Sequence, residues 1–416
     1  MERAAGVPTP LELEEAVRAV PGMDRILPAL DGAPSAFLVG GAVRDLLHGV
    51  GAVDLDLCVE GDAVETARVL AERLGGGEVV GHQRFGTATV RAGGLSVDLA
   101  ETRREFYERP GALPRVEPAD LEEDLGRRDF TVNAMAAALN GPSRGRLIDP
   151  YGGLADLDAR AIRVLHPRSF EDDPTRLLRA VRYEARLDAR MDPETEARAR
   201  AAVAAGALAT VSGPRVRVPL LALLSEAEVG WAVGRLADLG IDRALHPALD
   251  AQEELAASAA LASLETGAGR TLAVLAALVS SAPEPLATWL EQLGLPGDER
   301  DRVRRAAAAG PVLAETLASE RPDSELHALL GGEPPEALAL ALALGAPGGP
   351  VLRYLERLRR VRLEVTGREL LDAGVPPSPA LGRALAETLR RKLDGEVAGH
   401  DEELRMALAL AREHGA

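Results

Sequence analysis

The sequence predicts an α+β protein, in which a small β-sheet head with helices is followed by a long, all-helical neck, body and tail. Residues 35–140 alternate short apolar runs with turns, as short strands and helices of one small sheet do. From residue 154 onward, apolar residues recur at helical spacing between loops that contain Gly and Pro. Aromatic residues make up only 3% of the chain, and segments rich in Ala and Leu favour helices.

Four segments follow from this pattern, because 416 residues exceed what one ordinary core accommodates. Residues 1–34 are expected to form a helical lead-in, with a short helix at 11–20. Residues 35–150 are the predicted head. Residues 151–225 are the predicted neck, and residues 226–416 the helical body and tail.

Short elements follow one another within the predicted head. Apolar runs bounded by turn residues indicate strands, and apolar residues at a spacing of three to four indicate helices. The elements expected in order are a strand at 35–39, a helix at 42–49, a strand at 53–60, a helix at 61–75 and a hairpin at 88–101. Residues 106–124 contain three prolines, so they predict a loop that cannot join the sheet.

Composition limits the classes of function. The net charge of −17 argues against nonspecific nucleic-acid binding, although it leaves room for a local basic face. Lys392 is the only lysine, so nearly all positive charge is arginine, whose forked guanidinium suits phosphates and base edges. Cys58 is the only cysteine, which excludes an internal disulfide. We expect its side chain to be buried as a small hydrophobic group.

The expected surroundings of the chain follow from the same composition. The seven histidines are scattered without metal-ligand spacing, so no zinc is expected. Neither a secretory signal nor an apolar run of about 18 residues is evident, so we expect no membrane segment and a cytoplasmic location.

Two acidic residues at 54 and 56 carry the first chemical prediction. Because Asp54 and Asp56 are two apart on a predicted strand, both side chains point to one face. Two neighbouring carboxylates repel each other unless a cation lies between them, and Mg²⁺ prefers such oxygen ligands. We therefore predict Asp54 and Asp56 as catalytic residues and metal ligands. The alternative is a pair of exposed acids on an edge strand.

A glycine pair precedes these acids. Gly40 and Gly41 allow the backbone to approach a ligand closely, and the free N–H groups of the following helix can hold a phosphate. Arg44 in the first helical turn adds a charged donor. Asp98, on the predicted strand at 95–100, is a third catalytic candidate, since two-metal phosphoryl transfer often uses three acids. A solvent-facing strand residue is its alternative.

Several ordered motifs together resemble the bacterial class II tRNA nucleotidyltransferases and related poly(A) polymerases. A weaker similarity continues at 366–385 and 392–397, whereas 210–350 matches little. The motifs are GGAVRD and DLD, RRDFTVNAMA (127–136), LIDPYGGLADL (147–157) and FEDDPTRLLRAVRYEARL (170–187). The resemblance implies a nucleotidyltransferase-type head, Mg²⁺ as cofactor, ATP and CTP as substrates and tRNA as acceptor.

Transfer without a nucleic-acid template requires the protein to read the incoming base. Asp173 and Arg176 are three apart on a predicted helix at 173–187, so they are expected to share a face. An Asp–Arg pair offers an acceptor and donors, which matches the amine and ring nitrogen of cytosine and adenine. The resemblance assigns base selection to this pair and places Arg179 near the triphosphate. An intrahelical salt bridge is the alternative.

Four further residues are expected to contact the nucleotide. Asp129 is predicted to cap a helix that begins near Phe130 and carries Asn133 one turn later. The resemblance makes Arg128, Asp129 and Asn133 contacts to ribose, base or phosphates. It also matches Arg103 to a nucleotide-contacting arginine. The alternative for Arg128, Asp129 and Asn133 is a plain capped helix, and the alternative for Arg103 is a surface charge.

The resemblance assigns RNA binding to the tail, which would recognise the folded tRNA by shape. Solvated helix faces are the alternative for each basic stretch. The candidate stretches are Arg302, Arg304 and Arg305; Arg353, Arg357, Arg359, Arg360 and Arg362; and Arg390, Arg391 and Lys392.

Complete CCA addition is the predicted activity. The PGALP segment resembles long A-adding enzymes, but their extra N-terminal domains are not expected here, since the predicted head starts at residue 35. The alternatives are A-only addition, CC-only addition and poly(A) polymerisation. From other classes, a non-catalytic RNA-binding protein and an antibiotic-modifying nucleotidyltransferase also stay open.

Overall fold

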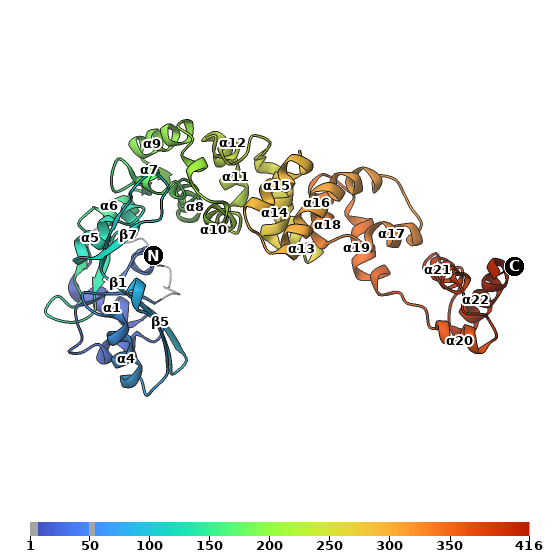
Figure 1. The fold of residues 1–416 in the computed structure, drawn as a ribbon, viewed down its shortest axis with the longest axis horizontal. Helices are drawn as coiled ribbons and strands as arrows, with labels where there is room; N and C mark the ends of the chain where they lie inside the picture. Colours follow the sequence, from blue (N-terminus) through green and yellow to red (C-terminus); the bar gives the residue numbers. More distant parts are fainter. Residues whose placement is uncertain (1–6, 50–54, 416) are drawn as a thin grey trace. The chain divides into compact units, whose positions relative to one another are not determined.

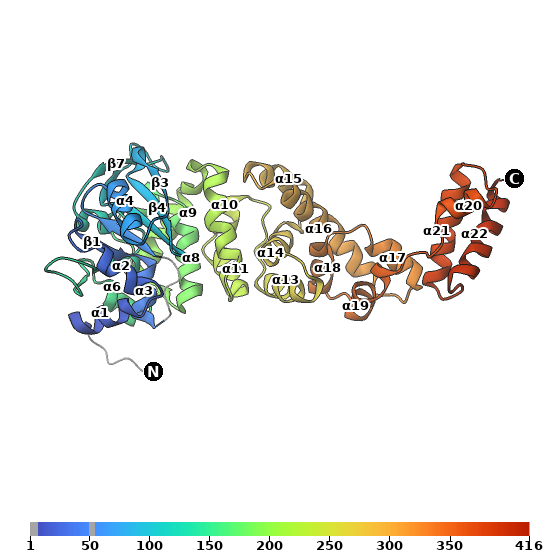
Figure 2. The same ribbon diagram turned by 90° about the horizontal axis from the view of Figure 1, so that it is seen from below.

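The computed structural model describes residues 7–49 and 55–415. Packing divides the chain into two compact units. The first consists of Met1–Pro219 with Asp238–Leu245, and the second of Leu220–Ala237 with His246–Ala416. All strands that the structure describes belong to the first unit, whereas the yellow to red part of the chain is helical (Figures 1 and 2). The predicted α+β class, with a sheet head followed by helices, is confirmed.

A seven-stranded sheet organises the head. Its strand order is β3-β4-β5-β2-β1-β8-β9, and β2 and β5 are parallel whereas the other neighbours are antiparallel. The strands are β1 (Ala36–Val39), β2 (Asp56–Val59), β3 (Glu78–His82), β4 (Thr87–Ala92), β5 (Leu95–Glu101), β8 (Ala136–Ala138) and β9 (Leu147–Ile148). The strand predicted at 35–39 and the hairpin predicted at 88–101 are therefore confirmed.

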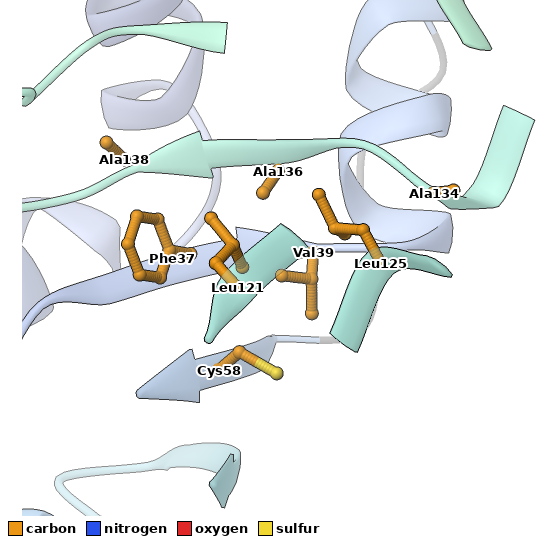
Figure 3. Packing of buried hydrophobic residues seen from close by; sticks show 8 residues of the cluster. All are labelled: Phe37, Val39, Cys58, Leu121, Leu125, Ala134, Ala136 and Ala138. Carbon is orange, nitrogen blue, oxygen red and sulfur yellow. The ribbon is translucent and has the colours of Figure 1, made fainter. Parts of the chain in front are cut away.

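Helices cover both faces of this sheet. Helix α4 (Ala63–Arg73) contacts β2, β3, β4 and β5. Its first turn is capped by Asp62, whose side chain accepts a hydrogen bond from the backbone N–H of Glu65. Helix α5 (Leu121–Gly126) packs on the other face. There Leu121 and Leu125 pack in one cluster with Ala134, which follows η2, and with strand residues (Figure 3), which are Phe37, Val39, Cys58, Ala136 and Ala138.

The loop predicted at 106–124 is partly wrong. Strands β6 (Arg103–Phe106) and β7 (Arg115–Pro118) pair as a separate antiparallel ribbon, and α5 follows directly. The ribbon stays outside the seven-stranded sheet, as the prolines predict. Pro118 stands at the end of β7, where a missing N–H does not interrupt a central strand.

The other helices follow the predicted pattern. In the first unit they are α1 (Pro10–Arg18), α2 (Met23–Ala29), α3 (Gly41–His48), α6 (Gly153–Asp158), α7 (Ser169–Asp172), α8 (Arg176–Leu187), α9 (Pro193–Ala204) and α12 (Ile241–Leu245), with the short strands β10 (Ala161–Ile162) and β11 (Arg190–Met191). Single 3₁₀ turns are η1 (Gln83–Phe85), η2 (Thr131–Asn133), η3 (Ala207–Thr210) and η4 (Leu358–Arg360).

The chain passes between the units three times: within α10 (Gly213–Leu224), within α11 (Val229–Asp238) and directly after α12, between Leu245 and His246. The second unit then continues with α13 (Glu253–Thr266), α14 (Arg270–Val279), α15 (Pro283–Gln292), α16 (Gly297–Thr316), α17 (Asp323–Leu330), α18 (Pro335–Ala343), α19 (Gly348–Glu356), α20 (Gly367–Asp372), α21 (Pro379–Leu393) and α22 (His400–Gly415). Among the described residues, no helix combines the length and apolar composition that a bilayer crossing needs.

Candidate active site

A glycine turn joins β1 to α3. Gly40 has φ +66° and ψ −130°, in the left-handed region that favours glycine, and it precedes the first helical residue Gly41. A Cβ atom on Gly40 would lie 2.7 Å from Nη1 of Arg128. The missing side chain therefore lets this guanidinium approach the backbone at the start of α3.

Arg44 is held beside this turn. Its side chain is 3% exposed, and its Nη1 donates to Oδ1 of Asn133 over 2.5 Å. Its Nε donates to Oδ1 of Asp45 over 2.8 Å, and its guanidinium lies 5.1 Å from the ring centroid of Tyr183. These contacts fix the guanidinium before any ligand arrives, so little side-chain entropy is lost on binding.

Asp129 connects Asn133 to Arg179. Its Oδ1 accepts from the backbone N–H of Phe130 and from Nδ2 of Asn133, both at 2.9 Å. Nη2 of Arg179 lies 2.6 Å from Oδ2. Burial alone would raise the pKa of Asp129, but the Arg179 guanidinium and the Asn133 amide hold that pKa below its ordinary value. The carboxylate is therefore charged at neutral pH.

The helix predicted from Phe130 is wrong. Only the single 3₁₀ turn η2 forms at Thr131–Asn133, and Asp129 bonds to the N–H of its immediate neighbour. The chain leaves this turn at once to enter strand β8, which lies between β1 and β9. Phe130, Val132 and Met135 are nevertheless buried, as their apolar character predicts.

Asp173 and Arg176 also differ from the prediction, since they do not share a helix. Helix α8 begins at Arg176, and Asp173 is extended with φ −133° and ψ 91°. Pro174 explains this, because the residue before a proline is driven out of the helical region. Oδ1 of Asp173 accepts from N and Oγ1 of Thr175, so the aspartate closes a turn ahead of the helix.

Arg176 reaches the same place from the first position of α8. Its side chain is almost fully buried, and Nη1 donates to Oγ of Ser169 over 2.6 Å. Nη2 donates to the backbone oxygen of Arg127 over 2.8 Å. The two predicted base-reading residues thus flank one pocket although they come from different local structures.

These groups converge on a pocket of about 500 Å³. It contains six arginines and four acidic residues, which gives a local positive excess in an acidic protein. Such a lining suits a polyanion such as a triphosphate. Ten of the predicted site residues line it, namely Gly40, Gly41, Arg44, Asp56, Arg128, Asp129, Asn133, Asp173, Arg176 and Arg179; the others are Glu105, Tyr107, Pro114, Arg127, Tyr183 and Arg215.

A second hollow of about 350 Å³ shares Asp56, Arg127 and Arg128 with this pocket. It also contains Asp98, which stands opposite Asp56 in the register of the parallel strands β2 and β5. Partners in register project to one face of a sheet. Oδ1 of Asp98 accepts from Oγ1 of Thr89 over 2.6 Å, which orients the carboxylate.

These carboxylates fit a hard divalent cation. Asp56 and Asp98 bring oxygen donors to one face, and Mg²⁺ takes such donors together with phosphate oxygens. Asp54, the other predicted ligand, lies outside the described residues. Within residues 7–49 and 55–415, acidic, His and Cys side chains do not gather in threes around a metal-sized position. The metal-binding role stays a prediction.

Asp124, which the sequence did not single out, supports two arginines of the pocket from behind its lining. Its carboxylate is fully buried, and its Oδ1 accepts from Nε of Arg127 over 2.9 Å and from the backbone N–H of Arg103 over 3.2 Å. Its Oδ2 accepts from Nη2 of Arg128 over 2.9 Å. Burial alone would raise the pKa of Asp124, but the two guanidiniums hold that pKa below its ordinary value.

Cys58 lies against the same carboxylate and is buried, as predicted. Its Sγ lies 3.6 Å from Oδ2 of Asp124. Burial first, and then the Asp124 charge, raise the pKa of the Cys58 thiol to about 12. The thiol is therefore neutral and unreactive at neutral pH.

Replacing Asp124 by asparagine is expected to lower the free energy of unfolding of the head by about 3 kcal/mol, because two arginines lose a buried partner. The pKa of Asp124 is lower in the folded protein, so the wild-type stabilisation is complete above the unfolded pKa of about 3.9 and is lost as pH falls through the folded pKa. The free energy of unfolding of the Asp124→Asn variant should therefore fall less than that of wild type as the pH is lowered through this range. Urea unfolding at neutral and acidic pH measures both effects.

The matched control is Asp120→Asn on the same helix. Asp120 caps α5 from an exposed position, and asparagine caps a helix about as well as aspartate does. An Asp124→Asn protein as stable as this control at neutral pH would contradict the assigned role.

Arg215 is a second missed residue and joins three segments. From α10, its Nη2 donates to Oδ1 of Asp173 over 3.1 Å. Its Nη1 donates to the backbone oxygen of Gly111 over 2.5 Å. The segment between β6 and β7 is thereby tied to the predicted base-reading aspartate. Since Arg215 lies beyond the recognisable motifs, no sequence signal identified it.

Arg103 lies outside the lining of both hollows. Its Nη1 donates to the backbone oxygen of Phe85 over 3.3 Å, and its Nε lies 3.9 Å from Oε1 of Glu105. Glu105 in turn accepts from Arg127 and from the Tyr107 hydroxyl. The predicted nucleotide contact of Arg103 stays a prediction.

Most of the predicted RNA-binding basic residues have acidic partners inside the second unit. The ion pairs are Arg302–Glu336, Arg305–Glu333, Arg353–Asp323, Arg357–Asp323, Arg390–Glu387, Arg391–Glu387, Lys392–Glu364 and Lys392–Glu403. Arg304, Arg359 and Arg360 are exposed. Part of the predicted basic surface therefore serves the packing of the unit itself.

Comparison with known proteins gives consistent results. Residues 36–163 match the family described as "Poly A polymerase head domain". The chain is 36% identical to an A-adding tRNA nucleotidyltransferase of Geobacter sulfurreducens over 90% of its own length, but it spans only 45% of that relative. It is 35% identical to an A-adding tRNA nucleotidyltransferase of Halalkalibacterium halodurans, covering 91% of this chain and 88% of the relative.

Other similar proteins carry different names. A CC-adding tRNA nucleotidyltransferase of Deinococcus radiodurans is 36% identical, over 88% of this chain and 87% of the relative. Among solved structures, a Thermotoga maritima CCA-adding enzyme complexed with tRNA_CCA has a TM-score of 0.79 and 30% identity, over 97% of this chain and 99% of that one. A CCA-adding enzyme with CTP has a TM-score of 0.81 and 31% identity, over 97% and 98% of the two chains.

Proposed function

Because this chain belongs to the tRNA nucleotidyltransferase family, we propose that it adds CMP and AMP residues to the 3′ end of tRNA and completes the CCA sequence without a nucleic-acid template. One observation carries the proposal: Asp173 and Arg176, the proposed base-reading pair, line the same arginine-rich pocket as Asp56, a proposed metal ligand. Similar proteins named for A-, CC- and CCA-addition share this chain's length, so nucleotide specificity is the finer part of the proposal.

In the proposed reaction, the 3′ oxygen of the RNA attacks the α-phosphorus of CTP or ATP, and pyrophosphate leaves. The residues Asp54, Asp56 and Asp98 would hold Mg²⁺, which when bound activates the attacking oxygen and stabilises negative charge on the phosphates. The N–H groups of the turn at Gly41 and the guanidinium of Arg44 would hold the leaving phosphates.

Base selection is proposed for Asp173 and Arg176. The aspartate offers acceptors to the exocyclic amine that cytosine and adenine share, and the arginine offers donors to the neighbouring ring nitrogen. Arg215 orients Asp173, because it donates directly to that carboxylate. Uracil and guanine present the opposite arrangement of donors and acceptors, so their binding would leave buried groups unpaired.

For the RNA, we propose that the helical second unit contacts the folded tRNA and that the protein acts in the cytoplasm. The exposed arginines of that unit support phosphate contacts. The solved complex of a similar CCA-adding enzyme with tRNA supports the choice of acceptor.

Three tRNA transcripts test the proposal. They end directly before CCA, after the first C and after both C residues, and each is incubated with the protein, Mg²⁺ and either CTP, ATP or both. With both nucleotides present, we expect each transcript to be extended to a complete CCA end and no further. UTP and GTP serve as controls and should not be incorporated. If none of the three transcripts accepted a nucleotide, the enzymatic proposal would be refuted and a non-catalytic RNA-binding protein would be favoured.

A-only addition is the second candidate, favoured by the names of the relatives from Geobacter sulfurreducens and Halalkalibacterium halodurans. Under this alternative, only the transcript that ends after both C residues accepts a nucleotide, and that nucleotide is AMP. Incorporation of CMP alone into the two shorter transcripts would instead identify a CC-adding enzyme.

A further inference from the structure

We propose that Phe85 and Arg84 form a stacking site for the last base of the RNA acceptor, at the rim of the second hollow. The inference rests on the proposed function and adds the binding position of the acceptor end. Phe85 is the last residue of η1, and its side chain is 58% exposed. An isolated exposed phenylalanine needs no explanation, so the argument depends on where this ring lies and what surrounds it.

The backbone places Phe85 next to the lining of the second hollow, which includes Asp56 and Asp98. Gly86 turns the chain in a left-handed conformation, with φ +56°, into β4. The first residue of β4, Thr87, lines the second hollow, as does Thr89, which donates to Asp98. Only one residue therefore separates Phe85 from the lining that contains Asp56 and Asp98.

The position of Phe85 is fixed from two sides. The backbone N–H of Glu101 donates to the oxygen of Gly86 over 2.8 Å, which ties the turn to the end of β5. Arg103 donates to the backbone oxygen of Phe85, and its Nε lies near Glu105, a residue of the nucleotide pocket. This gives Arg103 a positioning role: it connects the nucleotide pocket to the exposed ring.

The charge beside the ring suits a nucleotide. The guanidinium of Arg84 lies 5.8 Å from the ring centroid of Phe85, and Arg84 is exposed. A base can stack on the ring while its phosphate meets the guanidinium. Stacking tolerates any base, which fits an acceptor whose last base changes with each addition.

Phe106 provides a matched comparison within the same unit. It is 46% exposed, and the guanidinium of Arg104 lies 5.3 Å from its ring centroid. Its neighbours on the ribbon, Glu105 and Tyr107, line the nucleotide pocket. Because successive strand residues point to opposite sides, Phe106 points away from that pocket.

The test compares Phe85→Ala, Phe85→Trp and Phe106→Ala in steady-state transfer to the three transcripts. Stacking on an aromatic side chain is worth about 1–3 kcal/mol per base. Phe85→Ala should therefore lower kcat/KM for the RNA about 5- to 150-fold, with the KM for the nucleotide unchanged. Phe85→Trp should retain wild-type values, and Phe106→Ala should change neither parameter. Urea unfolding verifies that the variants remain folded.

Two results would overturn the inference: an unchanged kcat/KM for RNA in Phe85→Ala, or an equal loss in Phe106→Ala. A binding measurement separates this outcome from failure of the proposed function. If the wild-type protein transfers no nucleotide, the fluorescence anisotropy of a labelled RNA ending in CC still compares the affinities of wild type and Phe85→Ala. Equal affinities would refute the stacking site, and weaker binding by the variant would support it.

Discussion

Replacing Asp56 by asparagine is expected to reduce nucleotide transfer to RNA about 1000-fold or more. Asp56 lines both hollows and lies in register with Asp98. Asparagine keeps the shape of the side chain but removes the charge that a divalent cation requires. Metal ions contribute several kcal/mol to phosphoryl transfer, and about 1.4 kcal/mol corresponds to a tenfold change in rate.

Single-turnover transfer of a radiolabelled nucleotide measures this effect across a Mg²⁺ titration. Binding of the nucleotide itself should change only a few-fold, because the pocket arginines remain. Asp62→Asn is the matched control, since Asp62 is an exposed cap of α4 in which asparagine substitutes well. Replacing both Asp54 and Asp56 by alanine should lower the transfer rate little more than Asp56→Asn does, because ligands of one metal act as a unit. Undiminished transfer by the double variant would refute the proposed active centre.

The second large effect concerns base selection. Replacing Asp173 by asparagine should lower kcat/KM for CTP and ATP about 10- to 100-fold, because a charged hydrogen bond is worth about 1.5–3 kcal/mol. The asparagine amide can also donate a hydrogen bond, so kcat/KM for UTP and GTP should fall less than kcat/KM for CTP and ATP. The preference for CTP over UTP should therefore fall by a similar factor, as competition between the two nucleotides in one reaction would measure.

Asp172→Asn is the matched control for this change. Asp172 is the last residue of α7 and pairs with Arg168, outside the lining of the pocket. We expect its nucleotide preference to equal that of wild type. If Asp173→Asn retained the full preference for CTP over UTP, base reading would have to depend on other residues.

The sequence predicts those parts of the fold that local rules determine. The glycine turn at Gly40 and the hairpin at 88–101 each depend on residues that are adjacent in the chain. Strand β8 was missed because its residues, Ala136–Ala138, have no β-branched or aromatic side chain and form a strand only through pairing with β1 and β9.

The candidate site divides in the same way. Residues within recognisable motifs could be selected from sequence, and ten of them line one pocket. Asp124 and Arg215 could not be selected, because what distinguishes them is contact with segments that only the tertiary structure brings near. The predicted helical spacing of Asp173 and Arg176 fails for a local reason, since Pro174 keeps Asp173 in an extended conformation ahead of the helix.

The wall that the two hollows share, formed by Asp56, Arg127 and Arg128, has a consequence for repeated addition. In the proposed reaction, the residue added by one transfer would lie on the donor side of this wall, away from the side on which the acceptor hydroxyl attacks. The RNA end would therefore have to move by one residue before the next triphosphate could enter. In the proposed reaction, the number of nucleotides added is thus governed by how many such translocation steps the acceptor stem permits.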